Sequence, residues 1–214
     1  MAEVSVRNVR LSYGKIQALK DVSLEVEEGS LFGIIGPDGA GKTSLFRIMT
    51  TLIVPDSGSA HVCGYDTVKD MTEIRRLVGY MPGHFSLYQD LTVEENLSLF
   101  ASFFNTTVQE NYSLVEAISR QIEPFRKRRA GKLSGGMKQK LALCCAMIHR
   151  PRVLFLDEPT TGVDPVSRKE FWQMLSRLKA LGMTIIVSTP YMDEASLCDT
   201  VSLMQDGRFV RTDT

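Results

Sequence analysis

Residues 36–43, which read GPDGAGKT, combine glycines with a lysine and a hydroxyl in an arrangement suited to binding phosphate groups. Glycines let backbone amides turn inward and approach a polyphosphate closely. A continuously apolar run at residues 31–35 precedes the segment, and a stretch of helical character at 43–52 follows it. A strand before it and a helix after it predict a phosphate-binding loop, in which Lys42 reaches the β and γ phosphates and Thr43 ligates Mg²⁺.

A pair of acids, Asp157 and Glu158, follows a second apolar run at residues 153–156. Ligands of open parallel sheets bind beyond the carboxyl ends of the strands. We therefore expect Asp157 to approach the Mg²⁺ held by Thr43, through water, and Glu158 to polarise the attacking water as general base. For either acid taken alone, an exposed acidic turn is the alternative interpretation.

A third segment, LSGGM at residues 133–137, has the composition of a helix start that binds an anion. Ser134 is a favourable N-cap, and Gly135 and Gly136 leave the first backbone amides accessible. A capped helix without a ligand is the alternative.

The pattern of apolar residues predicts how these segments are supported. Alternation at residues 4–11 and 22–26 is typical of half-buried strands, and residues 55–58 (PDSG) predict a turn. Further on, apolar strands at 153–156 and 183–187 enclose a helix at 165–180, which predicts a parallel α/β sheet.

Residues 83–150 have a helical pattern and lie between the strands of this sheet, so they are expected to be an insertion. Two helical faces are predicted within them. The first consists of Val93, Leu97, Phe100 and Phe104, and the second of Leu114, Ala117, Ile118 and Ile122.

Composition argues against several classes of protein. Lys+Arg and Asp+Glu each number 25, so there is no excess positive charge, and the basic cluster at residues 126–129 is interpreted as a solvated face and not as a nucleic-acid contact. No apolar run approaches the ~18 residues of a membrane span, and the first residues do not resemble a signal peptide, so an intracellular soluble chain is expected. The four cysteines form no CxxC pair and are expected to be buried, reduced thiols.

The three motifs, in this order, resemble those of ABC-transporter ATP-binding subunits, and the resemblance covers essentially the whole chain. It implies an α/β P-loop NTPase with a RecA-like parallel sheet core, an N-terminal antiparallel β subdomain and an inserted α-helical subdomain. The chain would be one ATP-binding domain, residues 1–214, with the helical insertion at about 83–150.

The resemblance also assigns the site. ATP and Mg²⁺ are the implied cofactors, with Glu158 and Lys42 catalytic, Thr43 and Asp157 on the metal, and Tyr13 stacked on adenine. Ser134, Gly135 and Gly136 would complete, in trans, the ATP pocket of a second such domain arranged head to tail. The ATP-binding loop would comprise Gly36, Pro37, Asp38, Gly39, Ala40, Gly41, Lys42, Thr43 and Ser44.

Residues 133–165 look most like the ATPases of export systems with separate ABC-2-type permeases, including multidrug exporters. This implies a cytoplasmic protein attached to the inner face of the cell membrane, with a permease and a second ATPase domain as partners. Asp164 resembles the aspartate of the D-loop that signals between the two sites. Residues 85–88 lie where such proteins receive the permease, although core packing explains them equally well.

Two positions depart from the family. Gly83 stands where a glutamine normally contacts Mg²⁺ and water, and Pro190 stands where a switch histidine normally holds the γ phosphate. Proline has neither a side-chain donor nor a backbone N–H. His84 or Tyr191 could substitute, but each is shifted by one residue. We expect ATP binding of ordinary strength and slower or partner-dependent hydrolysis.

Three functions are therefore compared: a transport ATPase, which is favoured, an ATP-binding half that mainly clamps a partner ATPase, and an ATPase that acts on ribosomes or DNA. The last is disfavoured because the chain shows neither two fused ATPase halves nor a long coiled coil.

Overall fold

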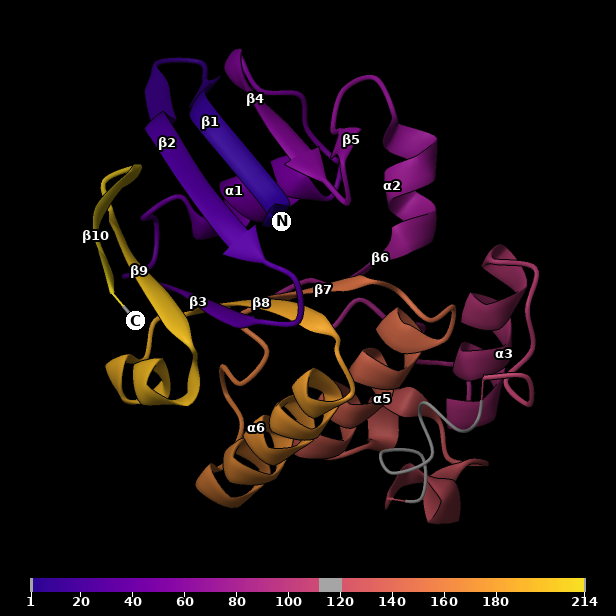
Figure 1. The fold of residues 1–214 in the computed structure, drawn as a ribbon. Coiled ribbons are helices and arrows are strands. Elements are labelled where there is room, and N and C mark those ends of the chain that lie inside the picture. The colour runs from indigo at the N-terminus through magenta and orange to yellow at the C-terminus, as the bar shows by residue number, and fades with distance from the viewer. Residues whose placement is uncertain (1, 112–120, 214) are drawn as a thin grey trace.

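The computed structural model describes residues 2–111 and 121–213, and its centre is a six-stranded sheet (Figure 1). The strand order is β10-β9-β3-β8-β7-β6. All neighbours from β9 to β6 are parallel, and β10 is antiparallel to β9, so the predicted parallel core is confirmed. The strands are β3 (Leu31–Ile35), β6 (Val78–Met81), β7 (Val153–Asp157), β8 (Thr184–Thr189), β9 (Thr200–Gln205) and β10 (Arg208–Asp213).

A second, four-stranded sheet is antiparallel and has the order β2-β1-β4-β5. The predicted alternation is confirmed in its first two strands, where the apolar positions are buried. The predicted turn at residues 55–58 is wrong in its second half, because Ser57 already pairs with Arg10. The strands are β1 (Ala2–Tyr13), β2 (Ile16–Glu27), β4 (Ser57–Val62) and β5 (Tyr65–Asp66).

The helices lie on both faces of the six-stranded sheet. One of them, α1, lies between the two sheets, whereas α5 and α6 cover the opposite face (Figure 1). The helix predicted at 165–180 is confirmed as α6. The described helices are α1 (Lys42–Met49), α2 (Met71–Leu77), α3 (Val93–Phe103), α5 (Gly135–Met147) and α6 (Pro165–Ala180), with short 3₁₀ helices η1 (Glu123–Phe125), η2 (Ala130–Lys132) and η3 (Met192–Leu197).

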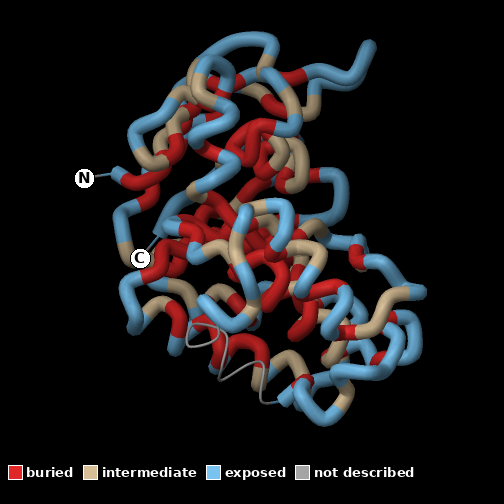
Figure 2. Tube along the Cα trace, turned by 90° about the vertical axis from the view of Figure 1, so that its right-hand side faces the viewer, coloured by how far each residue is buried: buried red, intermediate tan, exposed pale blue. Residues whose placement is uncertain are grey.

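Strand alternation divides the interior into two cores. In β7, Val153 and Phe155 face α1 and the antiparallel sheet, whereas Leu154 and Leu156 face α5 and α6. Because successive side chains of a strand point to opposite faces, a strand covered on both sides must be apolar throughout. All five residues of β3 are buried, as are the four apolar residues of β7 and Asp157, the acid with which β7 ends. Buried segments accordingly gather in the middle of the molecule (Figure 2).

The stretch 83–150 supplies α3, η1, η2 and α5. The first predicted helical face is confirmed for three of its four residues: Val93 and Leu97 are buried in α3, and Phe100 packs against the same core. The prediction was wrong for Phe104, which is the C-cap residue after α3 and is only partly buried. The helix begins at a capping box: Thr92 Oγ1 accepts the Glu95 amide, and the Glu95 carboxylate accepts the Thr92 amide. Of the second predicted face, residues 114, 117 and 118 lie outside the described residues, and Ile122 is buried. The division into one domain at 1–214 with an insertion stays a prediction.

The cysteines follow the expectation only in part. All four are free thiols, and burial raises the pKa of the Cys144 thiol to about 12. Cys144 and Cys145 are buried in α5, but Cys63 and Cys198 are only partly buried, so full burial was wrong for these two. Within the described residues, no helix combines the length and apolar character needed to cross a bilayer.

His149 fastens the end of α5 to the central sheet. Its ring stacks on Phe104, with centroids 3.7 Å apart and planes 5° from parallel, and its Nε2 lies 3.0 Å from the Val78 carbonyl oxygen. If Nε2 donates that bond, Nδ1 is the unprotonated nitrogen, and Nδ1 is buried without a hydrogen-bond partner among the described residues. Burial lowers the pKa of His149, against a smaller raising effect of the Val78 carbonyl.

This geometry predicts that acid weakens the fold through His149. Its folded-state pKa is lowered, so the stabilising contribution is present above the unfolded pKa of about 6.5 and is lost as the pH falls below it. Urea unfolding at pH 7.5 and pH 5.5 should show a larger loss for the wild type than for His149→Gln, which cannot titrate. Equal losses in the two proteins would contradict this role.

Candidate functional site

The phosphate loop connects β3 to α1. Backbone conformation and close contacts explain why glycines occupy three of its positions. Gly39 and Gly41 have φ of +81° and +107°, a region that side chains with a Cβ rarely adopt. A Cβ on Gly36 would lie 2.1 Å from the Met204 carbonyl oxygen. Gly41 is the N-cap of α1, so the first amides of the helix face the loop. Amides at a helix start form a natural anion site.

Lys42 joins the loop to the acidic strand. Its side chain is only 3% exposed. The ammonium donates to the Gly36 carbonyl at 2.7 Å and to the Pro37 carbonyl at 3.0 Å. It also lies 3.1 Å from Oε1 of Glu158, the acid that the sequence predicted as general base. The loop and the acidic strand end, far apart in the sequence, therefore meet at one buried cation.

The two acids are held from β8 by Ser188. The Ser188 hydroxyl donates to Asp157 Oδ1 at 2.5 Å and accepts the Glu158 amide at 3.0 Å. The same amide also donates to the Ser188 carbonyl at 3.0 Å. Glu158 has a φ of +49°, which is unusual for a residue with a side chain. Such strain persists only where neighbours enforce it, and it occurs often at functional sites.

A cleft of about 480 Å³ lies over the phosphate loop. Tyr13 borders it, 44% exposed, and its hydroxyl oxygen accepts a long hydrogen bond of 3.4 Å from Ser44. The predicted residues that line it are Tyr13, Asp38, Gly39, Ala40, Gly41, Lys42, Thr43, Ser44 and Glu158. The structure thus brings Tyr13, most of the loop and Glu158 to one concave surface.

Sequence reasoning missed the β9–β10 turn, which borders the same cleft. The Gly207 amide donates to the Ala40 carbonyl at 2.9 Å, and the Lys20 amide donates to the Gly207 carbonyl at 2.7 Å. Position 207 requires glycine for two reasons. Its φ is +77°, and a Cβ there would lie 2.6 Å from the Ala18 carbonyl oxygen. The only signal was the turn-forming pair Asp206-Gly207, which many surface turns share.

The glycine-rich start of α5 lies away from this cleft. Ser134 is the N-cap, and its hydroxyl accepts the Met137 amide at 3.4 Å. A Cβ on Gly136 would lie 2.4 Å from Ser167 Oγ, at the start of α6. Asp164 caps α6, because its carboxylate accepts a hydrogen bond from the Ser167 amide. This hydrogen bond lowers the pKa of the Asp164 carboxyl. None of Ser134, Gly135 and Gly136 lines the cleft of their own chain.

The structure places the two residues that depart from the family pattern, Gly83 and Pro190. Gly83 lies beside the two acids, and Pro190 follows β8. A Cβ on Gly83 would lie 3.1 Å from the Asp157 carbonyl oxygen and 3.7 Å from Glu158 Cβ. Position 83 is therefore beside both acids but contributes no side chain. Pro190 directly follows β8. The Tyr191 ring lies 4.2 Å from the guanidinium of Arg168, so it is already engaged with α6.

The aromatic segment near residue 85 is divided between core and surface. Leu87 is buried, Tyr88 is 53% exposed, and Phe85 packs against the core while Lys138 lies over its ring. Core packing therefore explains Leu87, and Tyr88 is available at the surface.

Comparison with known proteins shows which family the chain resembles. The family described as ABC transporter matches residues 19–161. The chain is 47% identical over 197 residues to "Probable multidrug ABC transporter ATP-binding protein YbhF" of Escherichia coli, covering 90% of this chain and 34% of that protein. It is 38% identical to "Doxorubicin resistance ATP-binding protein DrrA" of Mycobacterium tuberculosis, covering 99% and 65%. The chain thus spans about a third of the first relative and about two thirds of the second.

A third relative and a solved structure extend the comparison. Nod factor export ATP-binding protein I of Burkholderia lata is 37% identical, covering 97% of this chain and 69% of that protein. The dimeric post-hydrolysis structure of the ATP-binding cassette MJ0796, bound to ADP and Pi, superposes with a TM-score of 0.89 at 28% identity, covering 99% of this chain and 98% of the other. The chain therefore belongs to the ABC transporter family, as one of its ATP-binding cassettes.

Proposed function

We propose that this cassette binds Mg-ATP and hydrolyses it to power export through a separate membrane permease. The observation that carries the proposal is the contact between Lys42 and Glu158, because it joins a phosphate loop to a carboxylate that can activate water. The relatives named for multidrug, doxorubicin and Nod factor export support the export direction.

The chain's own groups have distinct tasks in this reaction. The loop amides and the α1 N-terminus bind the phosphates, and Tyr13 stacks on adenine. Lys42 exchanges its contact with Glu158 for phosphate oxygens, which leaves the Glu158 carboxylate free to accept a proton from water. Ser188 keeps the backbone of Glu158 in place during the exchange.

The donor set near the loop suits Mg²⁺. The Thr43 hydroxyl and the Asp157 carboxylate are hard oxygen ligands, and Ser188 holds only one of the two Asp157 oxygens. No group of three or more His, Cys, Asp or Glu side chains poised for a metal occurs among the described residues, which fits an ion that keeps waters and phosphate oxygens as its remaining ligands. When bound, Mg²⁺ neutralises charge on the phosphates.

A second cassette completes the site. Ser134, Gly135 and Gly136 present the amides of the α5 N-terminus outside their own cleft, so we assign them to the ATP of the opposite subunit. The dimeric structure of MJ0796 with ADP and Pi supports a pair of cassettes, and the head-to-tail arrangement is the one that the family resemblance implies. The permease contacts this pair at the exposed part of the 85–88 segment, on the cytoplasmic face of the membrane. Nucleic acid has no part in the reaction.

Hydrolysis by the isolated chain is proposed to be slow. Gly83, beside Asp157, and Pro190, directly after β8, stand where the resemblance implies a glutamine and a histidine, so the chain lacks both polar side chains. Losing one positioned donor typically slows chemistry by about 10²–10³-fold. The second candidate follows from the same two positions: a cassette that binds ATP mainly to clamp a partner ATPase.

Glu158→Gln separates these two candidates. Since a carboxamide at this position cannot accept a proton from water, the variant should lose at least about 10²-fold in steady-state ATPase rate while it still binds ATP and forms an ATP-dependent dimer. Lys42→Ala should weaken ATP binding itself. Equal rates for wild type and Glu158→Gln, with ATP still bound, would support the clamp and refute hydrolysis by this chain.

Restoring the polar side chains should raise the rate. The double variant Gly83→Gln, Pro190→His should hydrolyse ATP faster than wild type by about tenfold or more, because each group can orient water or phosphate oxygens. The matched control is Gly83→Ala, Pro190→Ala, which adds atoms without donors. A double variant no faster than this control would show that the two positions do not limit hydrolysis.

A further inference from the structure

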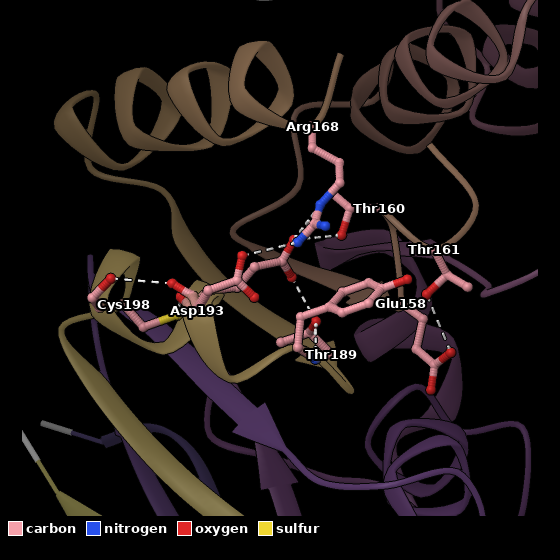
Figure 3. A network of polar contacts seen from close by, with 10 residues as sticks. Glu158, Thr160, Thr161, Arg168, Thr189, Asp193 and Cys198 are labelled. Atoms are coloured by element: carbon pink, nitrogen blue, oxygen red, sulfur yellow. Dashed lines mark hydrogen bonds and ion pairs between the residues drawn. The ribbon is translucent and has the colours of Figure 1, made fainter. Parts of the chain in front are cut away.

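A buried carboxylate outside the nucleotide cleft connects three segments of the site. Glu194, 2% exposed, accepts hydrogen bonds from Thr160 Oγ1 at 2.8 Å and from Thr189 Oγ1 at 2.5 Å. Figure 3 labels Thr160, Thr189 and Arg168, whose side chains converge in this network. Arg168 donates to the same carboxylate from Nε at 3.2 Å and from Nη2 at 3.0 Å. A charge so deeply buried is costly unless it is paired and hydrogen-bonded, and here both conditions are met.

The donors come from elements that surround the reacting groups. Thr160 lies two residues after Glu158, and Thr189 is the last residue of β8, directly after Ser188. Arg168 lies in the first turns of α6, after the Asp164 cap. Glu194 therefore ties the end of β7 to the end of β8 and to the start of α6.

The segment around Pro190 is fixed by the same group. The Tyr191 amide donates to Thr189 Oγ1 at 3.1 Å, while the Arg168 guanidinium covers the Tyr191 ring. Residues 189–191 are thus held by contacts within the chain, although Pro190 supplies no polar side chain of its own.

Glu194 is connected to Glu158 through neighbouring residues on both strands. The strained backbone of Glu158 is held by Ser188, the neighbour of Thr189, and the Thr161 amide closes a turn on the Glu158 carbonyl at 3.2 Å. Moving Thr160 or Thr189 must therefore shift the strand ends that orient Glu158 toward Lys42.

We propose that Glu194 is a positioning residue for hydrolysis: through Thr160 and Thr189 it holds the ends of β7 and β8 so that the Glu158 carboxylate faces the phosphate loop. This role rests on the proposed ATPase function. Glu194 does not line the cleft, and it acts only through the residues that it holds.

Steady-state kinetics test the role with Glu194→Gln, which keeps the size of the side chain and removes its charge. A small displacement of a reacting group can cost about 10²-fold in rate, so kcat should fall about 10- to 100-fold while KM for ATP stays within twofold. The matched control is Asp193→Asn: Asp193 also contacts Arg168, at 3.4 Å, but its side chain is 77% exposed. This control should stay within twofold of wild type in both constants.

Conservative variants separate positioning from general destabilisation. Thr189→Ser keeps the hydroxyl and should retain kcat, whereas Thr189→Val keeps the shape, loses the donor and should reproduce the kcat loss of Glu194→Gln. The positioning role is overturned if Glu194→Gln has the kcat of wild type, if its loss appears in KM alone, or if Thr189→Ser and Thr189→Val are equally impaired.

Amide hydrogen exchange of the nucleotide-free chain gives a readout that does not need turnover. Glu194→Gln should speed exchange at residues 157–161 and leave exchange in the phosphate loop unchanged. Asp193→Asn should leave exchange unchanged in both segments. A wild-type chain without ATPase activity would refute the proposed function and leave this test standing. Unchanged exchange at 157–161 in Glu194→Gln would refute the positioning role.

Discussion

The buried ammonium of Lys42 is the group on which the arrangement of the site depends. It contacts two carbonyls of the phosphate loop and the carboxylate of Glu158, so the loop after β3 and the first residue after β7 share one cation. The two strands are not neighbours, because β8 lies between them in the sheet. The contact therefore requires that parallel strands end at the same edge, that glycines allow the loop to fold back, and that Ser188 on β8 hold the acids in register.

The sequence predicted the parts of this arrangement that follow from periodicity and motif. The apolar runs of β3 and β7, the amphipathic helix α6 and the glycine-rich loop all carry strong local patterns. The strands β6, β9 and β10 were not predicted. Gly79 interrupts the four-residue strand β6, and β10 is an edge strand whose residues are mostly exposed, so neither has a distinctive pattern.

The supporting contacts could not be read from the chain because they join residues far apart in sequence. Gly207 supports the phosphate loop by a hydrogen bond to Ala40, which lies 167 positions earlier in the sequence. Nothing near Asp206-Gly207 distinguishes this turn from an ordinary surface turn. Thr160 and Glu194 are likewise 34 residues apart. By contrast, Gly83 and Pro190 stood out through the resemblance to the family, and the structure adds that position 83 lies directly against the backbone of Asp157.

We propose that ATP is held between Lys42 of one cassette and the Ser134 segment of another. The most direct measurement is a crystal structure of the Glu158→Gln chain with Mg-ATP, because slow turnover would preserve the nucleotide. The expected result is a head-to-tail pair in which Lys42 contacts the phosphates from one side and the α5 N-terminus of the second chain contacts them from the other. A nucleotide bound by a single chain, with Ser134, Gly135 and Gly136 remote from any phosphate, would contradict the shared site.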